Sequence, residues 1–152
     1  MSRDELETAL LGENTLVAEG GKRFPNAKRI KQENVKTTLD YIFNELLPQM
    51  GIEPEWVKSL GSTGKKLPGG SSGDIDIGID ASKVDWMEGC NNAKELSECV
   101  DRHCGPILDK LGLEHVCYAN LFSFNCPIQD VDGTQEGQFV QVDMMPTRSM
   151  DF

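Results

Sequence analysis

The stretch Asp74-Ile75-Asp76-Ile77-Gly78-Ile79-Asp80 places an isoleucine at every second position, with an acid or glycine between. This period of two predicts a half-buried β-strand whose isoleucines face the core, while Asp74 and Asp76 share the opposite face. Two carboxylates held side by side repel each other unless a cation lies between them. A hard divalent ion such as Mg²⁺ suits that position, because it takes oxygen ligands and often binds one or two carboxylates together with substrate phosphates.

A third carboxylate occurs in a second segment of similar character. Asp143 stands between Val142 and Met144 in the apolar segment 138–145, where an acid is otherwise out of place. If this segment is a strand next to 74–80, three carboxylates meet at one point. Such a site can hold two metal ions that stabilise the attacking and leaving oxygens of an in-line phosphoryl displacement. The predicted metal ligands and catalytic residues are Asp74, Asp76 and Asp143.

The segment 60–73, which precedes the acidic strand, is rich in glycine, serine and lysine. Gly61 lets the backbone approach a ligand closely. Free amides at a helix start, a hydroxyl group and a lysine ammonium all bind phosphate. The predicted nucleotide-phosphate cradle consists of Gly61, Ser62, Lys65, Lys66, Ser72 and Gly73.

Two better-known motifs do not fit this region. A Walker A loop ending at Lys65 requires glycine where Ser59 stands and serine or threonine where Lys66 stands. A calcium loop of the EF-hand type beginning at Asp74 requires glycine where Ile79 stands. An Asp-x-Asp pattern is common by itself, so a solvated strand face behind a flexible linker stays open as the alternative.

The remaining pattern predicts an α+β fold with a mixed, largely antiparallel sheet flanked by helices. Apolar residues recur at helical spacing over 33–47, and Pro48 and Gly51 close that segment. A second helix begins at Asn91 or Asn92, is interrupted by Gly105-Pro106 and continues briefly to Leu111. Further strands are expected at 56–60, 113–118, 121–126 and 138–145, the last two antiparallel. Residues 1–30, with a short helix at 4–11, are expected to form an N-terminal arm, and residues 31–152 one domain.

The chain of 152 residues has a net charge of −10, and this excess is confined to its second half. Residues 1–73 hold 10 acids and 10 bases, whereas residues 74–152 hold 15 acids and 5 bases. The overall acidity argues against tight, sequence-independent nucleic-acid binding. A basic cluster in the first half is either a solvated face or a backbone contact for a nucleic acid, and it consists of Lys22, Arg23, Lys28, Arg29, Lys31 and Lys36.

The cysteine count and the hydropathy predict a soluble, cytoplasmic protein with reduced thiols. Five cysteines are an odd number, and the spacing of the cysteines and histidines between 99 and 115 matches no common zinc module. The N-terminus lacks the apolar stretch of a secretory signal, and no run of about 18 apolar residues occurs.

The complete motif is more specific than its parts. Leu60-Gly61-Ser62, eleven intervening residues, Asp74-Ile75-Asp76-Ile77 and a later strand carboxylate resemble the signature of the DNA polymerase beta-like nucleotidyltransferase superfamily. This resemblance implies the palm-type fold of that superfamily, with 31–152 as its catalytic domain. It also implies that Gly61 and Ser62 hold nucleotide phosphates, that Asp74 and Asp76 bind both ions, and that Asp143 helps to activate the attacking hydroxyl.

Residues 18–30 and the helix after them are also similar to bacteriophage-encoded members described as poly(A) polymerase-like, which would place the protein in the host cytoplasm. The expected activity is transfer of a nucleoside monophosphate from an NTP, such as ATP, to an acceptor hydroxyl, with two Mg²⁺ or Mn²⁺ ions. The expected acceptor is a nucleic-acid 3′ end. The alternatives are a protein or small-molecule acceptor, or a non-catalytic NTP-binding module of a larger complex. The chain ends nine residues after Asp143, so a missing C-terminal domain or a partner subunit is expected, and template-directed synthesis is not.

Overall fold

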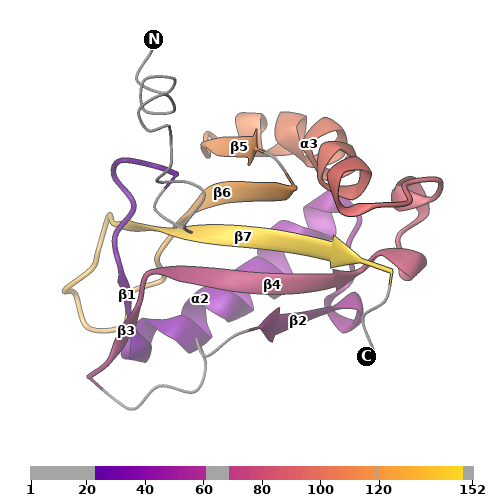
Figure 1. Cartoon of the computed structure of the whole chain (residues 1–152). Helices are drawn as coiled ribbons and strands as arrows, with labels where there is room; N and C mark the ends of the chain where they lie inside the picture. The colour runs from indigo at the N-terminus through magenta and orange to yellow at the C-terminus, as the bar shows by residue number, and fades with distance from the viewer. Residues whose placement is uncertain (1–22, 61–68, 119, 149–152) are drawn as a thin grey trace, which may run out of the picture.

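The computed structural model describes residues 23–60, 69–118 and 120–148. Its centre is a five-stranded sheet in the order β2-β4-β7-β6-β5 (Figure 1). β4 and β7 run parallel, while β2–β4, β6–β7 and β5–β6 pair antiparallel. The α+β class and the mixed, largely antiparallel sheet are therefore confirmed, as is the antiparallel pairing of the two strands before and after residues 128–138. The more specific palm-type fold stays a prediction.

The strands lie close to the predicted ranges. They are β2 (Val57–Leu60), β4 (Asp74–Asp80), β5 (His115–Tyr118), β6 (Leu121–Pro127) and β7 (Phe139–Thr147). The isoleucines of β4 are fully buried in one core cluster that also takes in residues of both helices, so both helices cover the same face of the sheet. No helix of the described residues packs on the opposite face, which we call the helix-free face and which carries the acidic side chains of β4 and β7.

The first predicted helix is a continuous helical segment with three geometries. A 3₁₀ turn (Gln32–Asn34) leads into α2 (Val35–Tyr41), a π-helical turn (Ile42–Leu46) and a second 3₁₀ turn (Leu47–Met50). The segment therefore passes Pro48, which is the second residue of the last turn, where a missing N–H costs little. It ends at Gly51, whose φ of 75° is left-handed and favours glycine.

The predicted interruption of the second helix is wrong. α3 runs unbroken from Ala93 to Lys110 and contains Pro106. Buried side chains on both sides of the proline, Val100 and Leu108, pack into the same core, and this packing outweighs the lost backbone hydrogen bond. Gly105 also has a positive role, because a Cβ there would lie 3.2 Å from Cε1 of His115.

The last residues of the expected N-terminal arm pack against the domain. Phe24 is 4% exposed, and Ala27 bridges to Phe139 at the start of β7. β1 (Ile30–Lys31) then pairs antiparallel with β3 (Ser71–Ser72), the short strand just before β4. The rest of the arm, including the helix expected at 4–11, lies outside the described residues.

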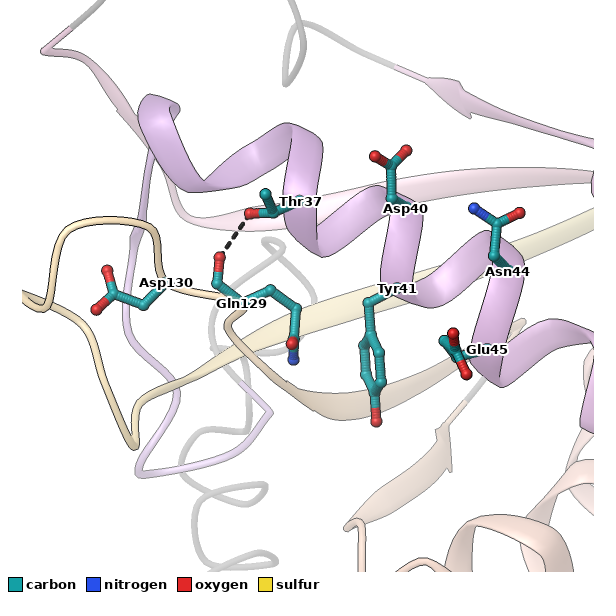
Figure 2. Close-up of a pocket in the computed structure, with 7 residues that line it drawn as sticks. All are labelled: Thr37, Asp40, Tyr41, Asn44, Glu45, Gln129 and Asp130. Atoms are coloured by element: carbon teal, nitrogen blue, oxygen red, sulfur yellow. Dashed lines mark hydrogen bonds between the residues drawn. The ribbon is translucent and has the colours of Figure 1, made fainter.

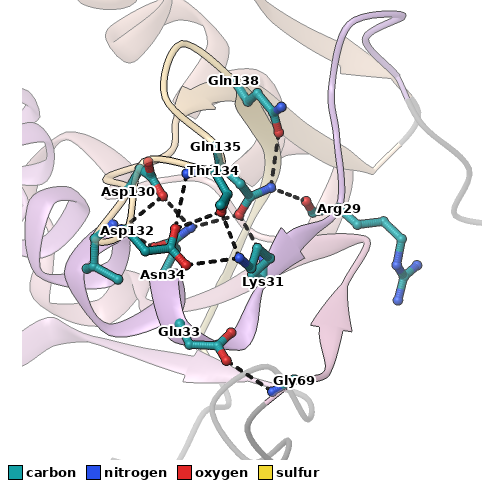
Figure 3. A network of polar contacts seen from close by, with 11 residues as sticks. Arg29, Lys31, Glu33, Asn34, Gly69, Asp130, Asp132, Thr134, Gln135 and Gln138 are labelled. Carbon is teal, nitrogen blue, oxygen red and sulfur yellow. Dashed lines mark hydrogen bonds and ion pairs between the residues drawn. The ribbon is translucent and has the colours of Figure 1, made fainter.

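A polar network fixes the loop between β6 and β7 against this segment (Figure 3). Gln135 is 5% exposed, accepts from the backbone N of Lys31 and donates to the carbonyl of Arg29 at 2.8 Å. Asn34 donates to Asp130 and Gln135, and Lys31 pairs with Asp132 at 3.0 Å. These contacts hold the backbone of Arg29 in place beside β3 and β4.

Two further sequence expectations concern thiols and membranes. All five cysteines carry free thiols, and four of them are buried. Within the described residues, no helix combines the length and the apolar character needed to cross a membrane.

Candidate metal centre on the helix-free face

The three predicted carboxylates are brought together by the parallel pairing of β4 and β7. In its register Asp76 lies opposite Asp143, and Asp74 lies opposite Gln141. One carboxylate oxygen from each of Asp74, Asp76 and Asp143 lies within 4.8 Å of the others. Asp143 is 69 residues from Asp74 and 67 residues from Asp76 in the chain. The pairing nevertheless brings all three to one point of the sheet.

Without a metal ion, the ionised forms of these carboxyl groups are unfavourable. Burial, followed by the neighbouring charges of Asp76 and Asp143, raises the pKa of Asp74 to about 7, and Arg29 opposes this shift. Burial and then Asp143 raise the pKa of Asp76 to about 6. A divalent cation among these groups would oppose both shifts, because opposite charge favours the ionised form of each carboxyl.

Asp143 is oriented by two donors on its Oδ1 atom. The Ser123 hydroxyl donates at 2.6 Å and Nε2 of Gln141 donates at 3.0 Å. Gln141 is itself held by the backbone N of Arg23, which donates to its Oε1 at 2.6 Å. Ser123, Gln141 and the backbone of Arg23 therefore hold the carboxylate of Asp143 in one direction. Asp143 is 4% exposed.

The donor set fits a hard divalent ion. Every candidate ligand atom is a carboxylate oxygen, as Mg²⁺ and Mn²⁺ prefer. Oδ1 of Asp76 is buried and accepts no hydrogen bond within the described part of the chain. A buried acceptor without a partner is costly, and a metal ion is a partner that would satisfy it.

The predicted phosphate cradle is only partly described. Gly61, Ser62, Lys65 and Lys66 lie outside the described residues. Ser72 lies in β3 and is 6% exposed, and its Oγ has no hydrogen-bond partner among the described residues. Gly73 is approached by the Arg29 guanidinium, because a Cβ at Gly73 would lie 3.3 Å from its Nη1.

Arg29 is a site residue that sequence reasoning placed in the basic cluster but not in the site. Its Nε donates to Ser71 Oγ at 2.8 Å and its Nη2 donates to the Ser71 carbonyl at 3.0 Å. The guanidinium is exposed and near enough to Asp74 to oppose the rise of its pKa. This places one cation beside the three carboxylates, next to the Ser71–Gly73 backbone.

Ser123 and Gln141 are also absent from the sequence predictions. Their signal was available, because Ser123 alternates with Phe122 and Phe124, and Gln141 stands between Val140 and Val142. Such alternation marks a strand with one polar face. Which polar side chain meets Asp143 depends on strand register, and this the alternation does not give.

A concave region lies over α2 and the start of the β6–β7 loop (Figure 2). It has a volume of about 490 Å³, and none of the predicted site residues lines it. Its walls carry the carboxylates of Asp40, Glu45 and Asp130 together with Tyr41. It is therefore separate from the candidate metal centre.

Comparisons with known proteins find no match, either to a protein family model or to a curated protein. Any functional assignment therefore rests on the residues and geometry of the site itself.

Proposed function

We propose that this protein is a metal-dependent nucleotidyltransferase, which moves a nucleoside monophosphate from an NTP to an acceptor hydroxyl. The observation that supports it most is the convergence of Asp74, Asp76 and Asp143, whose oxygens lie within 4.8 Å of one another. Three carboxylates from adjacent strands could hold two divalent ions when substrate phosphates and water supply the remaining oxygen ligands.

The three carboxylates would hold two Mg²⁺ or Mn²⁺ ions. When bound, these ions supply charge stabilisation for the phosphate oxygens and lower the pKa of the acceptor hydroxyl. The acceptor oxygen forms a bond to the α-phosphorus, the bond from that phosphorus to the β-phosphate oxygen breaks, and pyrophosphate leaves. Asp143, held through its Oδ1 by Ser123 and Gln141, lies ready to take the hydroxyl proton on its other oxygen.

Arg29 and the backbone of Ser71–Gly73 would bind the β- and γ-phosphates. The guanidinium is already oriented by its two hydrogen bonds to Ser71, so little side-chain entropy is lost on binding. Arginine matches the geometry of phosphate through parallel N–H donors. Gly61, Ser62, Lys65 and Lys66 are the further phosphate ligands that the sequence predicts.

A nucleic-acid 3′ end is the proposed acceptor. Two members of the basic cluster flank the carboxylates: Arg29 lies beside Asp74, and Arg23 is close enough to Asp143 for their charges to interact. A strand whose backbone contacts this segment would bring its 3′ hydroxyl to Asp143. The positive charge is modest, which favours an acceptor bound weakly and released after each addition.

The decisive experiment incubates the full chain with each NTP radiolabelled at the α-phosphate, Mg²⁺ or Mn²⁺, and RNA, DNA or protein acceptors. We expect a nucleic-acid acceptor to gain label with release of pyrophosphate. Asp76→Asn should reduce labelling about 100-fold or more, whereas Asp40→Asn, on the exposed face of α2, should not. Metal-dependent NTP binding without labelling of any acceptor would support a binding module instead. Equal labelling by Asp76→Asn would disprove the site.

A further inference from the structure

An apolar row lies beside the carboxylates on the helix-free face. The sheet register aligns one row of residues across β4, β7, β6 and β5: Asp76, Asp143, Ser123 and Val116. Two residues along each strand lies the next row on the same face, formed by Gly78, Met145, Leu121 and Tyr118. Because side chains alternate along a strand, both rows face the same way. We call Met145, Leu121 and Tyr118 the apolar shelf.

At the end of the shelf, the ring of Tyr118 lies beside the guanidinium of Arg23. Tyr118 is 50% exposed, an unusual exposure for an aromatic side chain at the edge of a sheet. The Cζ atom of Arg23 lies 5.6 Å from the centre of the Tyr118 ring, and its Nη1 donates to the Leu121 carbonyl at 3.1 Å. An exposed ring beside an arginine is the combination with which proteins stack unpaired nucleic-acid bases.

The shelf is coupled to the candidate metal centre through fixed contacts. The backbone N of Arg23 donates to Gln141, and Gln141 donates to Asp143. Strands lie about 4.8 Å apart and residues about 3.3 Å apart along them, so the backbones of Tyr118 and Asp143 are separated by about 12 Å. Their side chains project from the same face, and one nucleotide can extend between them.

We propose that the apolar shelf and Arg23 bind the 3′-terminal base of a single-stranded acceptor. This inference rests on the proposed nucleotidyl transfer and adds the place where its acceptor is held. The terminal base packs on the Tyr118 ring, and its 3′ hydroxyl reaches Asp143. Because every base has an apolar face, stacking of this kind binds single strands with little sequence preference.

The shelf fits the acceptor better than the incoming nucleotide. Arg29 and Ser71–Gly73, the described groups that suit phosphates, lie near Asp74 at the beginning of β4. The shelf lies toward the other end of β4, where Gly78 pairs with Met145 of the shelf. Asp143 stands between these two regions, where an acceptor hydroxyl and an α-phosphate would have to meet.

The test is an equilibrium titration of the full chain with a short single-stranded RNA that carries 2-aminopurine at its 3′ end, with Mg²⁺ and without NTP. Stacking on an aromatic ring quenches 2-aminopurine fluorescence. We expect the wild-type protein to quench it and Tyr118→Ala to bind about 10-fold more weakly with little quenching. Tyr118→Phe, which keeps the ring, should behave as wild type. Val131→Ala is the matched control, because Val131 is 53% exposed on the β6–β7 loop.

Each outcome decides the inference independently of the proposed function. Equal affinity and quenching with Tyr118→Ala would overturn the shelf, even if labelling of nucleic acid is observed. Absence of any RNA binding by the wild-type protein would also overturn it, while transfer to a protein or small molecule would leave the nucleotidyltransferase proposal standing. In the labelling assay, Tyr118→Ala should raise the KM for RNA and not the KM for NTP. A raised KM for NTP alone would assign the shelf to the incoming base.

Discussion

Asp76 and Asp143 face each other across the parallel pairing of β4 and β7, and both project from the side of the sheet opposite to α2 and α3. The two residues lie far apart in the chain, so only the folded sheet brings them together. The arrangement is unfavourable without a cation, because the carboxylates of Asp74, Asp76 and Asp143 share one half-buried site.

Stability of the metal-free protein should fall as pH rises through the acidic range. Asp74 and Asp76 have folded pKa values of about 7 and about 6, above the ordinary value of 3.8. Between pH 4 and pH 7 the folded state therefore binds more protons than the unfolded state, so the free energy of unfolding decreases with pH. Thermal unfolding in a chelator should show the difference in Tm between Asp74→Asn/Asp76→Asn and wild type growing from pH 5 to pH 8. A constant difference would contradict the shifts.

Mg²⁺ or Mn²⁺ should stabilise the folded protein at pH 7.5. Metal at about 100 times its Kd contributes about 2.7 kcal/mol, which raises Tm by roughly 5 to 10 °C. The rise should be smaller at pH 5, because protons then compete for the same oxygens. Calorimetry with and without metal measures both. Asp76→Asn should lose the metal response and Asp40→Asn should keep it. A response retained by Asp76→Asn would place the ion elsewhere.

Arg29→Ala should weaken NTP binding in the presence of Mg²⁺ by about 10-fold, since one charge-assisted contact to phosphate is lost. Arg29→Lys should recover only part of this affinity, because an ammonium cannot reproduce the oriented guanidinium. Lys36→Ala, which removes an exposed cation paired with Asp40, is the control. Titration with a fluorescent NTP analogue provides the measurement. Unchanged affinity in Arg29→Ala would remove Arg29 from the phosphate site.

Ser123→Ala should lower kcat for nucleotidyl transfer about 10-fold and leave the KM for NTP near its original value. The hydroxyl donates to Oδ1 of Asp143, so its loss affects the direction of the carboxylate. The loss of stability should be about 1 kcal/mol, because Gln141 still donates to the same oxygen. Ser123→Thr should recover part of the rate. Steady-state kinetics and urea unfolding separate the two effects, and an unchanged kcat would make Ser123 structural only.

Local pattern predicted the strands well, because alternation along 74–80 and 138–145 depends only on which side chains must be buried. It failed at Pro106, where local propensity predicted a break and packing on both sides of the proline maintained the helix. It also omitted Arg29, Ser123 and Gln141 from the site. Their roles arise from cross-strand contacts, and a basic or polar residue carries no sign of its distant partner.

The sequence by itself determined the acidic strand, the burial of its isoleucines and the three carboxylates expected to act together. These depend on side-chain chemistry and on the two-residue repeat of a strand. Tertiary structure alone decided that β7 pairs parallel to β4 with Asp143 opposite Asp76. It also decided that residues 23–31 pack beside the sheet and place Arg23 and Arg29 on either side of the carboxylates. Strand order and register are set by the packing of the whole core, in which a shift of one residue would turn Asp143 away from Asp76 and into the apolar interior.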